Sequence, residues 1–174
     1  PVREIRRIKA RVEAERIPRG TDRALHLKLG PGGLSDVEWT VQLIQLRHAH
    51  DVPGLRTTGT LAALDAAVDA GLVAAPDAAA LGAAWRLAAR IRDAVMLVRG
   101  RPGDTLPAKQ DELTAVARLL GYKPAASDDD QRAPGSRTRN GASSWSDTPA
   151  AALEEDYRRT ARQARKVMDR LFYG

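Results

Sequence analysis

A glycine-rich turn followed by two carboxylates is the part of this sequence whose residue types could do chemistry. Residues 30–33 read Gly-Pro-Gly-Gly, and Asp36 and Glu38 follow at the start of an expected helix. Backbone N–H groups at such a turn, leading into a helix N-terminus, can bind a phosphate. The spacing matches neither a Walker loop nor a dinucleotide-binding fingerprint. Both carboxylates would also repel a phosphate unless a cation lay between them.

The two carboxylates allow two interpretations. Asp36 and Glu38 resemble the Asp-x-Asp pair that holds magnesium in nucleotidyltransferases, but that pair lies on a strand, where residues i and i+2 share a face. On a helix the two residues diverge by about 200°. In the structural interpretation, Ser35 and Glu38 form a capping box, and Asp36 matches the positive end of the helix dipole. We favour capping for Glu38 and leave both interpretations open for Asp36.

The rest of the chain offers no catalytic or metal-binding set. The 174 residues include no cysteine, which excludes disulfides, thiolate zinc sites and cysteine nucleophiles. His48 and His50 diverge on a helix, and the acidic run at 128–130 is expected to be solvated. We therefore predict no catalytic residue and no metal site in this chain.

The amino-acid composition favours helices and limits where in the cell we expect the protein. Hydrophobic residues make up 43% of the chain and aromatic residues only 4%, so the core must consist mainly of Ala, Leu and Val. Such a core suits close-packed helices better than sheets. No stretch approaches 18 uninterrupted apolar residues, and no secretory signal opens the chain. We expect a cytoplasmic protein with no membrane partner and, because it begins with Pro1, a piece of a longer protein.

The net charge of +6 is concentrated at the two ends of the chain. Residues 1–20 carry seven basic and three acidic side chains, and residues 150–174 carry six basic and four acidic ones. Basic surfaces can bind nucleic acid. Few aromatic side chains are interleaved with these basic residues, so no stacking platform for single strands is visible. We do not expect nucleic acid to be a partner.

The elements that must position the glycine-rich turn are helices. Apolar spacing at three and four residues, together with Pro and Gly at the ends, predicts helices over 3–16, 36–50, 76–99, 109–120 and 150–172. It predicts a further helix that is capped by one of the threonines at 57, 58 and 60 and ends near 70. Two apolar stripes cover most of the helix over 36–50, so we expect it to be the central, most buried one. Its polar line of Glu38, Gln42 and Gln45 then needs partners.

Two segments do not read as helix. Residues 24–29 alternate strictly with leucine, which predicts either a strand in need of a partner or an extended connector that presses its leucines onto the helices. Residues 123–149 contain Trp145 as their one apolar residue besides alanine, so we expect a disordered linker there.

The chain is therefore predicted to be all-α. We expect a bundle of five to six helices with one short extended segment near 24–29. Residues 1–122 would form the bundle, including the glycine-rich turn at 30–33, and 150–174 would be a C-terminal helix that packs back on it.

Residues 26–48 carry a resemblance to a known family. The stretch HLKLGPGGLSDVEWTVQLIQLRH resembles the Lys-x-Gly-x-Gly-Gly-x-x-Asp-[Ile/Val]-Glu-[Phe/Trp]-x-x-Gln signature that opens a helical domain of bacterial glutamine synthetase adenylyltransferase. The resemblance extends over nearly the whole chain except 123–149, and the closing Phe-Tyr-Gly resembles actinobacterial members. The same helical domain type occurs in P-II uridylyltransferases, but the tryptophan in the signature favours the adenylyltransferase.

The resemblance implies a role in nitrogen regulation. The family transfers AMP from ATP to a tyrosine of glutamine synthetase and removes it by phosphorolysis, with magnesium and under control of a P-II signal protein. Its catalytic Gly-Ser and Asp-x-Asp motifs belong to a preceding nucleotidyltransferase domain. In this chain Gly135-Ser136 follows the acidic run at 128–130, which is the wrong order.

We therefore expect a helical accessory domain that is inactive alone and binds no cofactor alone. ATP and magnesium are implied for the longer enzyme, with the preceding nucleotidyltransferase domain, glutamine synthetase and the P-II signal protein as partners. The segment 24–29 would pair with or lie against the preceding domain. The candidate contacts of this chain to the nucleotide are Lys28, Gly32, Gly33, Asp36 and Glu38. The alternative is an independent helical binding module whose basic ends contact an acidic protein or nucleic acid.

Overall fold

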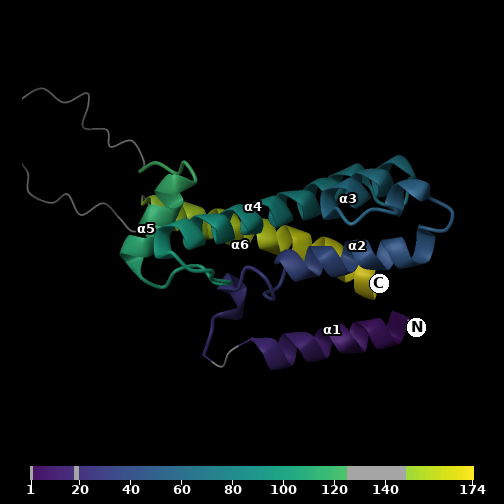
Figure 1. The fold of residues 1–174 in the computed structure, drawn as a ribbon, viewed down its shortest axis with the longest axis horizontal. Helices are drawn as coiled ribbons and strands as arrows, with labels where there is room; N and C mark the ends of the chain where they lie inside the picture. The colour runs from purple at the N-terminus through teal and green to yellow at the C-terminus, as the bar shows by residue number, and fades with distance from the viewer. Residues whose placement is uncertain (1, 18–19, 125–147) are drawn as a thin grey trace, which may run out of the picture.

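The computed structural model describes residues 2–17, 20–124 and 148–174, and within these ranges it is built of helices and connecting turns with no strand. In these described ranges, two 3-10 turns and a closing π-helical turn accompany six α-helices (Figure 1). The α-helices are α1 (Val2–Arg16), α2 (Leu34–His48), α3 (Thr60–Asp69), α4 (Ala75–Arg99), α5 (Gln110–Leu119) and α6 (Pro149–Met168). The all-α prediction is confirmed. The linker predicted over 123–149 lies, apart from its ends, outside the described residues.

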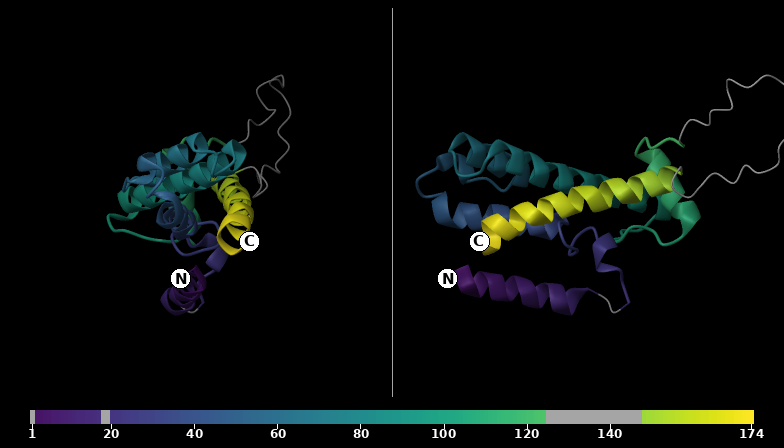
Figure 2. Two further views of the ribbon diagram at one scale, coloured as in Figure 1. Left: turned by 90° about the vertical axis from the view of Figure 1, so that its right-hand side faces the viewer. Right: turned by 180° about the vertical axis from the view of Figure 1, so that it is seen from behind.

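The long helices α4 and α6 lie side by side along the length of the molecule (Figures 1 and 2). Helices α2 and α3 pack at one end of this pair and α5 packs at the other, while α1 lies beneath α2. The two ends of the chain lie at the same end of the molecule. None of the described helices combines the length and the apolar character that crossing a bilayer requires.

The core has three parts, and α6 contributes to each of them. Leu153 and Tyr157 pack with the second half of α4 and with α5, and Ala164 packs with α2, α3 and the first half of α4. Met168 and Phe172 meet α2 and the apolar side of α1. Because α6 touches every part, it is the element that holds the bundle together.

Helix α2 differs from its prediction at both ends. It begins at Leu34, and its N-cap is Gly33 without any side-chain cap, so the predicted Ser35–Glu38 capping box is wrong. In its second half Gln42, Leu46 and Arg47 are exposed, and Leu46 is 73% exposed. The helix lies on the outside of the α4–α6 pair, and its second apolar stripe is covered only as far as Leu43, which is buried against Met168 and Phe172. Its polar line finds a partner at Gln45, whose Nε2 donates to the carbonyl oxygens of Leu55 and Thr57.

The segment 24–29 is not a strand. A 3-10 turn over Arg23–Leu25 is followed by a single antiparallel bridge between His26 and Thr105. The N–H of Leu27 donates to the Asp104 carbonyl oxygen at 2.7 Å. His26 and Leu27 are both buried, so alternation in the sequence does not separate two faces here. The segment therefore pairs with the loop after α4, inside this chain, and its contact with a preceding domain stays a prediction.

Candidate functional site

The glycine-rich turn is packed against backbone on two sides. Gly32 has a φ of 74°, and a Cβ there would overlap the carbonyl oxygen of Ala161 in α6. A Cβ at Gly33 would come within 2.6 Å of the Leu27 carbonyl oxygen. Both glycines are thus required by close backbone contact and, for Gly32, by the left-handed backbone. This packing accounts for the glycines without a ligand.

Asp36 binds cations and an N–H group with both of its carboxylate oxygens. Its Oδ1 lies 2.6 Å from Lys9 Nζ, and its Oδ2 accepts from the Gly32 N–H at 2.7 Å and from Arg165 Nη1 at 3.1 Å. Asp36 and Lys9 are each only 1% exposed. We call these four residues, Lys9, Gly32, Asp36 and Arg165, the Asp36 cluster. It joins α1, the glycine-rich turn, α2 and α6 at one point.

The Asp36 cluster shows what the turn does at the start of α2. A helix N-terminus and a glycine turn attract an anion. In this chain the anion at the Gly32 N–H is the carboxylate of Asp36 itself. A buried carboxylate is stable only where cations and hydrogen bonds compensate for its lost hydration. Lys9 and Arg165 supply that compensation, so the acidic signature residue has a structural partner set within the chain.

Arg165 and Arg6 extend the cluster to the end of the chain. Arg165 Nε pairs with Asp169 Oδ1 at 2.9 Å, and its guanidinium lies 5.7 Å from the ring centre of Tyr173. The Arg6 guanidinium lies 5.9 Å from the same ring centre, and its Nε donates to the Phe172 carbonyl oxygen at 2.6 Å. The closing π-helical turn over Asp169–Tyr173 is thereby fastened to α1.

A second buried polar pair lies beside the cluster. The Tyr157 hydroxyl donates to the His26 carbonyl oxygen at 3.4 Å, and His26 Nδ1 accepts from the Leu29 N–H at 3.1 Å. Burial raises the pKa of Tyr157 above its usual range, and the negative charge of Asp36 adds to that effect. Burial lowers the pKa of His26, although the Asp104 carboxylate acts in the opposite direction. Both side chains are therefore held neutral at pH 7.

The five predicted nucleotide contacts fall into two groups. Gly32 and Asp36 are buried and bonded to each other, and Gly33 is buried against the backbone of Leu27. Lys28 is exposed and Glu38 is half-buried, and neither side chain makes a hydrogen bond or an ion pair within the part of the chain that the structure describes. Of these five described residues, only Lys28 and Glu38 thus keep uncommitted polar side chains.

Lys9 and Arg165 are the residues that sequence reasoning missed. They lie 27 and 129 residues from Asp36 in the sequence. Lys9 does carry a weak signal, because it falls between Ile5 and Val12 on the apolar stripe of α1, where a charged residue needs a buried partner. Arg165 carries none, since it is one of six basic residues on α6 and its final turn.

Comparison of the sequence with known proteins shows which family and which proteins this chain is similar to. Residues 6–172 match the model of the GlnD PII-uridylyltransferase family. A bifunctional glutamine synthetase adenylyltransferase/adenylyl-removing enzyme from Streptomyces coelicolor is 54% identical over 173 residues, which cover 99% of this chain and 15% of the relative. The enzyme of the same name from Mycobacterium avium is 59% identical over 121 residues, or 70% of this chain and 12% of the relative. The chain therefore spans about 15% of the length of the Streptomyces relative.

Proposed function

The chain belongs to the family described as GlnD PII-uridylyltransferase, and from the names of its relatives we propose that it serves as the helical accessory domain of a glutamine synthetase adenylyltransferase. Relatives with that name match 99% of the chain, while the chain spans only 15% of their length. The longer enzyme would transfer AMP from ATP to glutamine synthetase and remove it again. In this proposal the catalytic carboxylates belong to a preceding nucleotidyltransferase domain.

The observation that carries this proposal is the Asp36 cluster. The signature by which the chain resembles the family holds α1 against the bundle through the Lys9–Asp36 pair. In the proposed enzyme α1 leads from the preceding domain, so the cluster fixes the orientation of that domain relative to the bundle. A fixed orientation is what a transferase needs in order to present a large protein substrate to its catalytic site.

The residues of this chain do not fit a magnesium site. Among the residues that the structure describes, no group of three or more His, Cys, Asp or Glu could hold a metal ion. Both oxygens of Asp36 already contact cationic or N–H groups. ATP and magnesium are therefore proposed for the preceding domain only. Lys28 and Glu38 are the two side chains of this chain that we propose as contacts to the nucleotide or to that domain.

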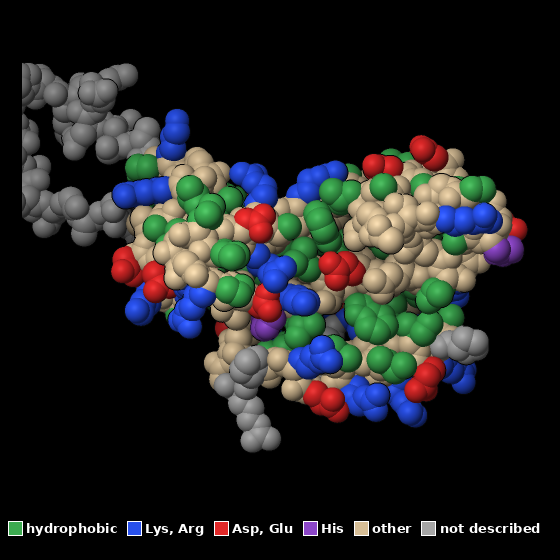
Figure 3. Space-filling view, viewed as in Figure 1, with side chains coloured by type: hydrophobic (Ala, Val, Ile, Leu, Met, Phe, Trp, Pro, Cys, Tyr) green, Lys and Arg blue, Asp and Glu red, His purple; other side chains and the backbone are tan. Residues whose placement is uncertain are grey.

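Glutamine synthetase and the P-II signal protein are the proposed partners, and the cytoplasm is the proposed location. The alternative of a basic module for acidic proteins or nucleic acid has less support. On α6, Arg158 pairs with Glu154, Arg159 with Asp156, and Arg162 with Glu155. On the face drawn in Figure 3, basic and acidic side chains are interspersed rather than gathered into one basic patch.

An AMP-transfer assay tests the proposal. Labelled ATP and glutamine synthetase are incubated with the 174-residue chain alone, and with a longer polypeptide that includes the preceding nucleotidyltransferase domain. We expect label on glutamine synthetase only with the longer polypeptide. Label transferred by the chain alone would contradict an accessory role. Transfer at an undiminished rate by the longer polypeptide after deletion of this chain would do so as well.

A further inference from the structure

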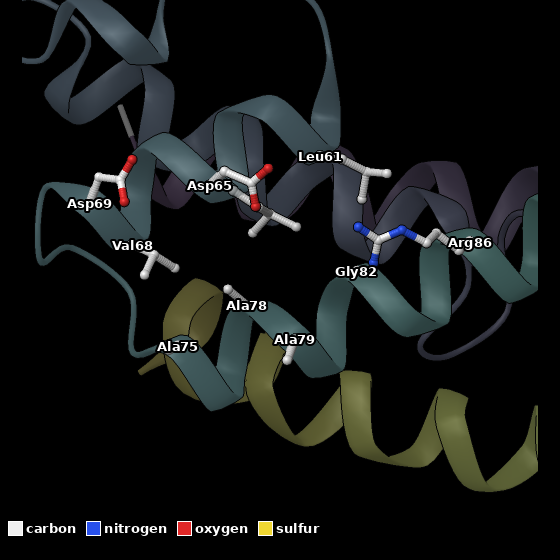
Figure 4. Close-up of a pocket in the computed structure, with 10 residues that line it drawn as sticks. Leu61, Asp65, Val68, Asp69, Ala75, Ala78, Ala79, Gly82 and Arg86 are labelled. Atoms are coloured by element: carbon white, nitrogen blue, oxygen red, sulfur yellow. The ribbon is translucent and has the colours of Figure 1, made fainter.

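A groove with a volume of about 490 Å³ lies between α3 and the first half of α4. Leu61, Leu64 and Val68 line it from α3, and Ala78 and Ala79 line it from α4 (Figure 4). It lies in the half of the molecule away from α5 and does not include the Asp36 cluster. Polar and apolar atoms contribute about equally to its lining, and its floor is low because the α4 side consists mainly of small side chains.

The charged groups on the rim of this groove have no partners among the described residues. Asp65 and Asp69 lie one helical turn apart on α3, and Arg86 lies on α4 toward the far end of the groove (Figure 4). None of the three makes a hydrogen bond or an ion pair within the described parts of the chain. The carboxylates of α6 behave differently, because most of them are paired with arginines of the same helix.

Gly82 lowers the α4 wall of the groove beside Arg86 (Figure 4). It lies in the interior of α4 with an ordinary helical backbone, where glycine is less favourable than alanine. A Cβ at Gly82 would lie 3.0 Å from Arg86 Nη1, which is the movable end of a long side chain, and 3.7 Å from Leu61. No fixed atom of the chain therefore requires a glycine here. Its effect is to keep the groove open.

We propose that the α3–α4 groove is a docking site for a basic amphipathic helix of a partner protein. Small apolar side chains of that helix would enter the groove over Gly82, and lysine or arginine side chains one turn apart would face Asp65 and Asp69. The spacing matches, because four residues rise about 6 Å along any α-helix. Helix-in-groove binding of this kind is a common mode of peptide recognition. The proposal is independent of the adenylyltransferase function.

A pair of synthetic helical peptides tests the proposal against the 174-residue chain. The basic peptide carries alanine and leucine on one face and two lysines, one turn apart, at its edge. The control peptide has glutamates in place of those lysines. We expect saturable binding of the basic peptide, measured by fluorescence anisotropy, and at least tenfold weaker binding of the acidic one. The proposal is overturned if the basic peptide shows no saturation up to millimolar chain concentration.

Variants at exposed positions locate the binding without disturbing the fold. The double variant Asp65→Lys/Asp69→Lys should weaken binding of the basic peptide at least tenfold and favour the acidic peptide. The double variant Asp93→Lys/Asp111→Lys makes the same change in net charge outside the groove and should leave binding of the basic peptide within twofold. If the two double variants weaken binding equally, the binding is a nonspecific charge attraction and the proposal is overturned.

A third variant tests the shape of the groove. Ala79→Leu places a larger side chain on an exposed groove position, so we expect tenfold weaker peptide binding with an unchanged melting temperature. Unchanged binding would overturn the proposal. Sedimentation of the chain alone addresses the other possible occupant. Self-association that disappears in Asp65→Lys/Asp69→Lys would assign the groove to a second copy of the chain.

Discussion

Two regions of this molecule use glycine and aspartate for different purposes. In the Asp36 cluster, a glycine and a carboxylate are buried, and the chain itself supplies every partner that the structure shows for them. In the α3–α4 groove, Gly82 meets no fixed neighbour, and Asp65 and Asp69 have no ionic partner among the described residues. Glycine and aspartate are therefore ambiguous by type. A structural site has its partners within the chain, whereas a binding surface takes them from another molecule.

Among the substitutions that test this comparison, Gly32→Ala should lower the free energy of unfolding the most. The new Cβ would overlap the backbone of α6 and would also occupy a left-handed conformation. We expect a loss of more than about 4 kcal/mol in the free energy of unfolding, or failure to fold. The matched control is Gly71→Ala, which has a φ of 69° in open space and should lose only about 1–2 kcal/mol. Urea unfolding followed by circular dichroism measures both, and equal losses would refute the packing argument.

Asp36→Asn should have the next largest effect. The amide removes the charge that compensates the buried Lys9, and loss of one partner from a buried pair costs about 3–5 kcal/mol. Glu38→Gln changes a neighbouring carboxylate that has no partner among the described residues, and should cost less than about 0.5 kcal/mol. Urea unfolding of both variants gives the comparison. A loss below about 1 kcal/mol for Asp36→Asn would show that the pair contributes little to the fold.

Acid should weaken the region around the Asp36 cluster through His26. Because burial lowers the pKa of His26 in the folded state, the neutral form stabilises the fold above the unfolded pKa of about 6.5. That stability is lost as the pH falls through and below this value. We expect His26→Gln to flatten the dependence of the melting temperature on pH between 7 and 5. A curve for His26→Gln parallel to that of the unchanged chain would assign the acid sensitivity to other groups.

The smallest expected effect is a gain in stability, and it comes from a substitution in the groove. Gly82→Ala should stabilise the chain by about 0.5–1 kcal/mol, because alanine is the better helix former and only the end of Arg86 must move. Thermal melting detects the gain. A loss instead of a gain would mean that Gly82 is required by internal packing, which would remove the contrast with Gly32.

The helices could be predicted from the sequence because apolar spacing and terminal Gly or Pro are local signals. The capping box failed for a local reason too, since Gly33 takes the cap position and draws Ser35 into the helix. At the end of α6 the π-helical turn shifts the register, so that Phe172 is buried and Leu171 is only half-buried. Such a widened turn has no signal in a 3.6-residue pattern.

The candidate site was less predictable than the fold. The sequence motif indicated Asp36 as a residue of interest, but it did not tell which atoms would meet its carboxylate. Those atoms come from Lys9 and Arg165, on elements far apart in the chain. Only the packing of α1 and α6 against α2 brings them together. A short motif can therefore mark a site while the role of its residues depends on the tertiary structure.

The position of α6 also has a consequence for how the chain folds. Helix α6 contributes to all three parts of the core, and its Tyr157 contacts His26 across 131 residues of sequence. During synthesis, the apolar surface of α2 through α5 that α6 covers therefore remains open until α6 has left the ribosome. Contacts of such long sequence separation slow folding and prolong the exposure of apolar surface. A chaperone would accordingly have its longest opportunity to bind before α6 arrives.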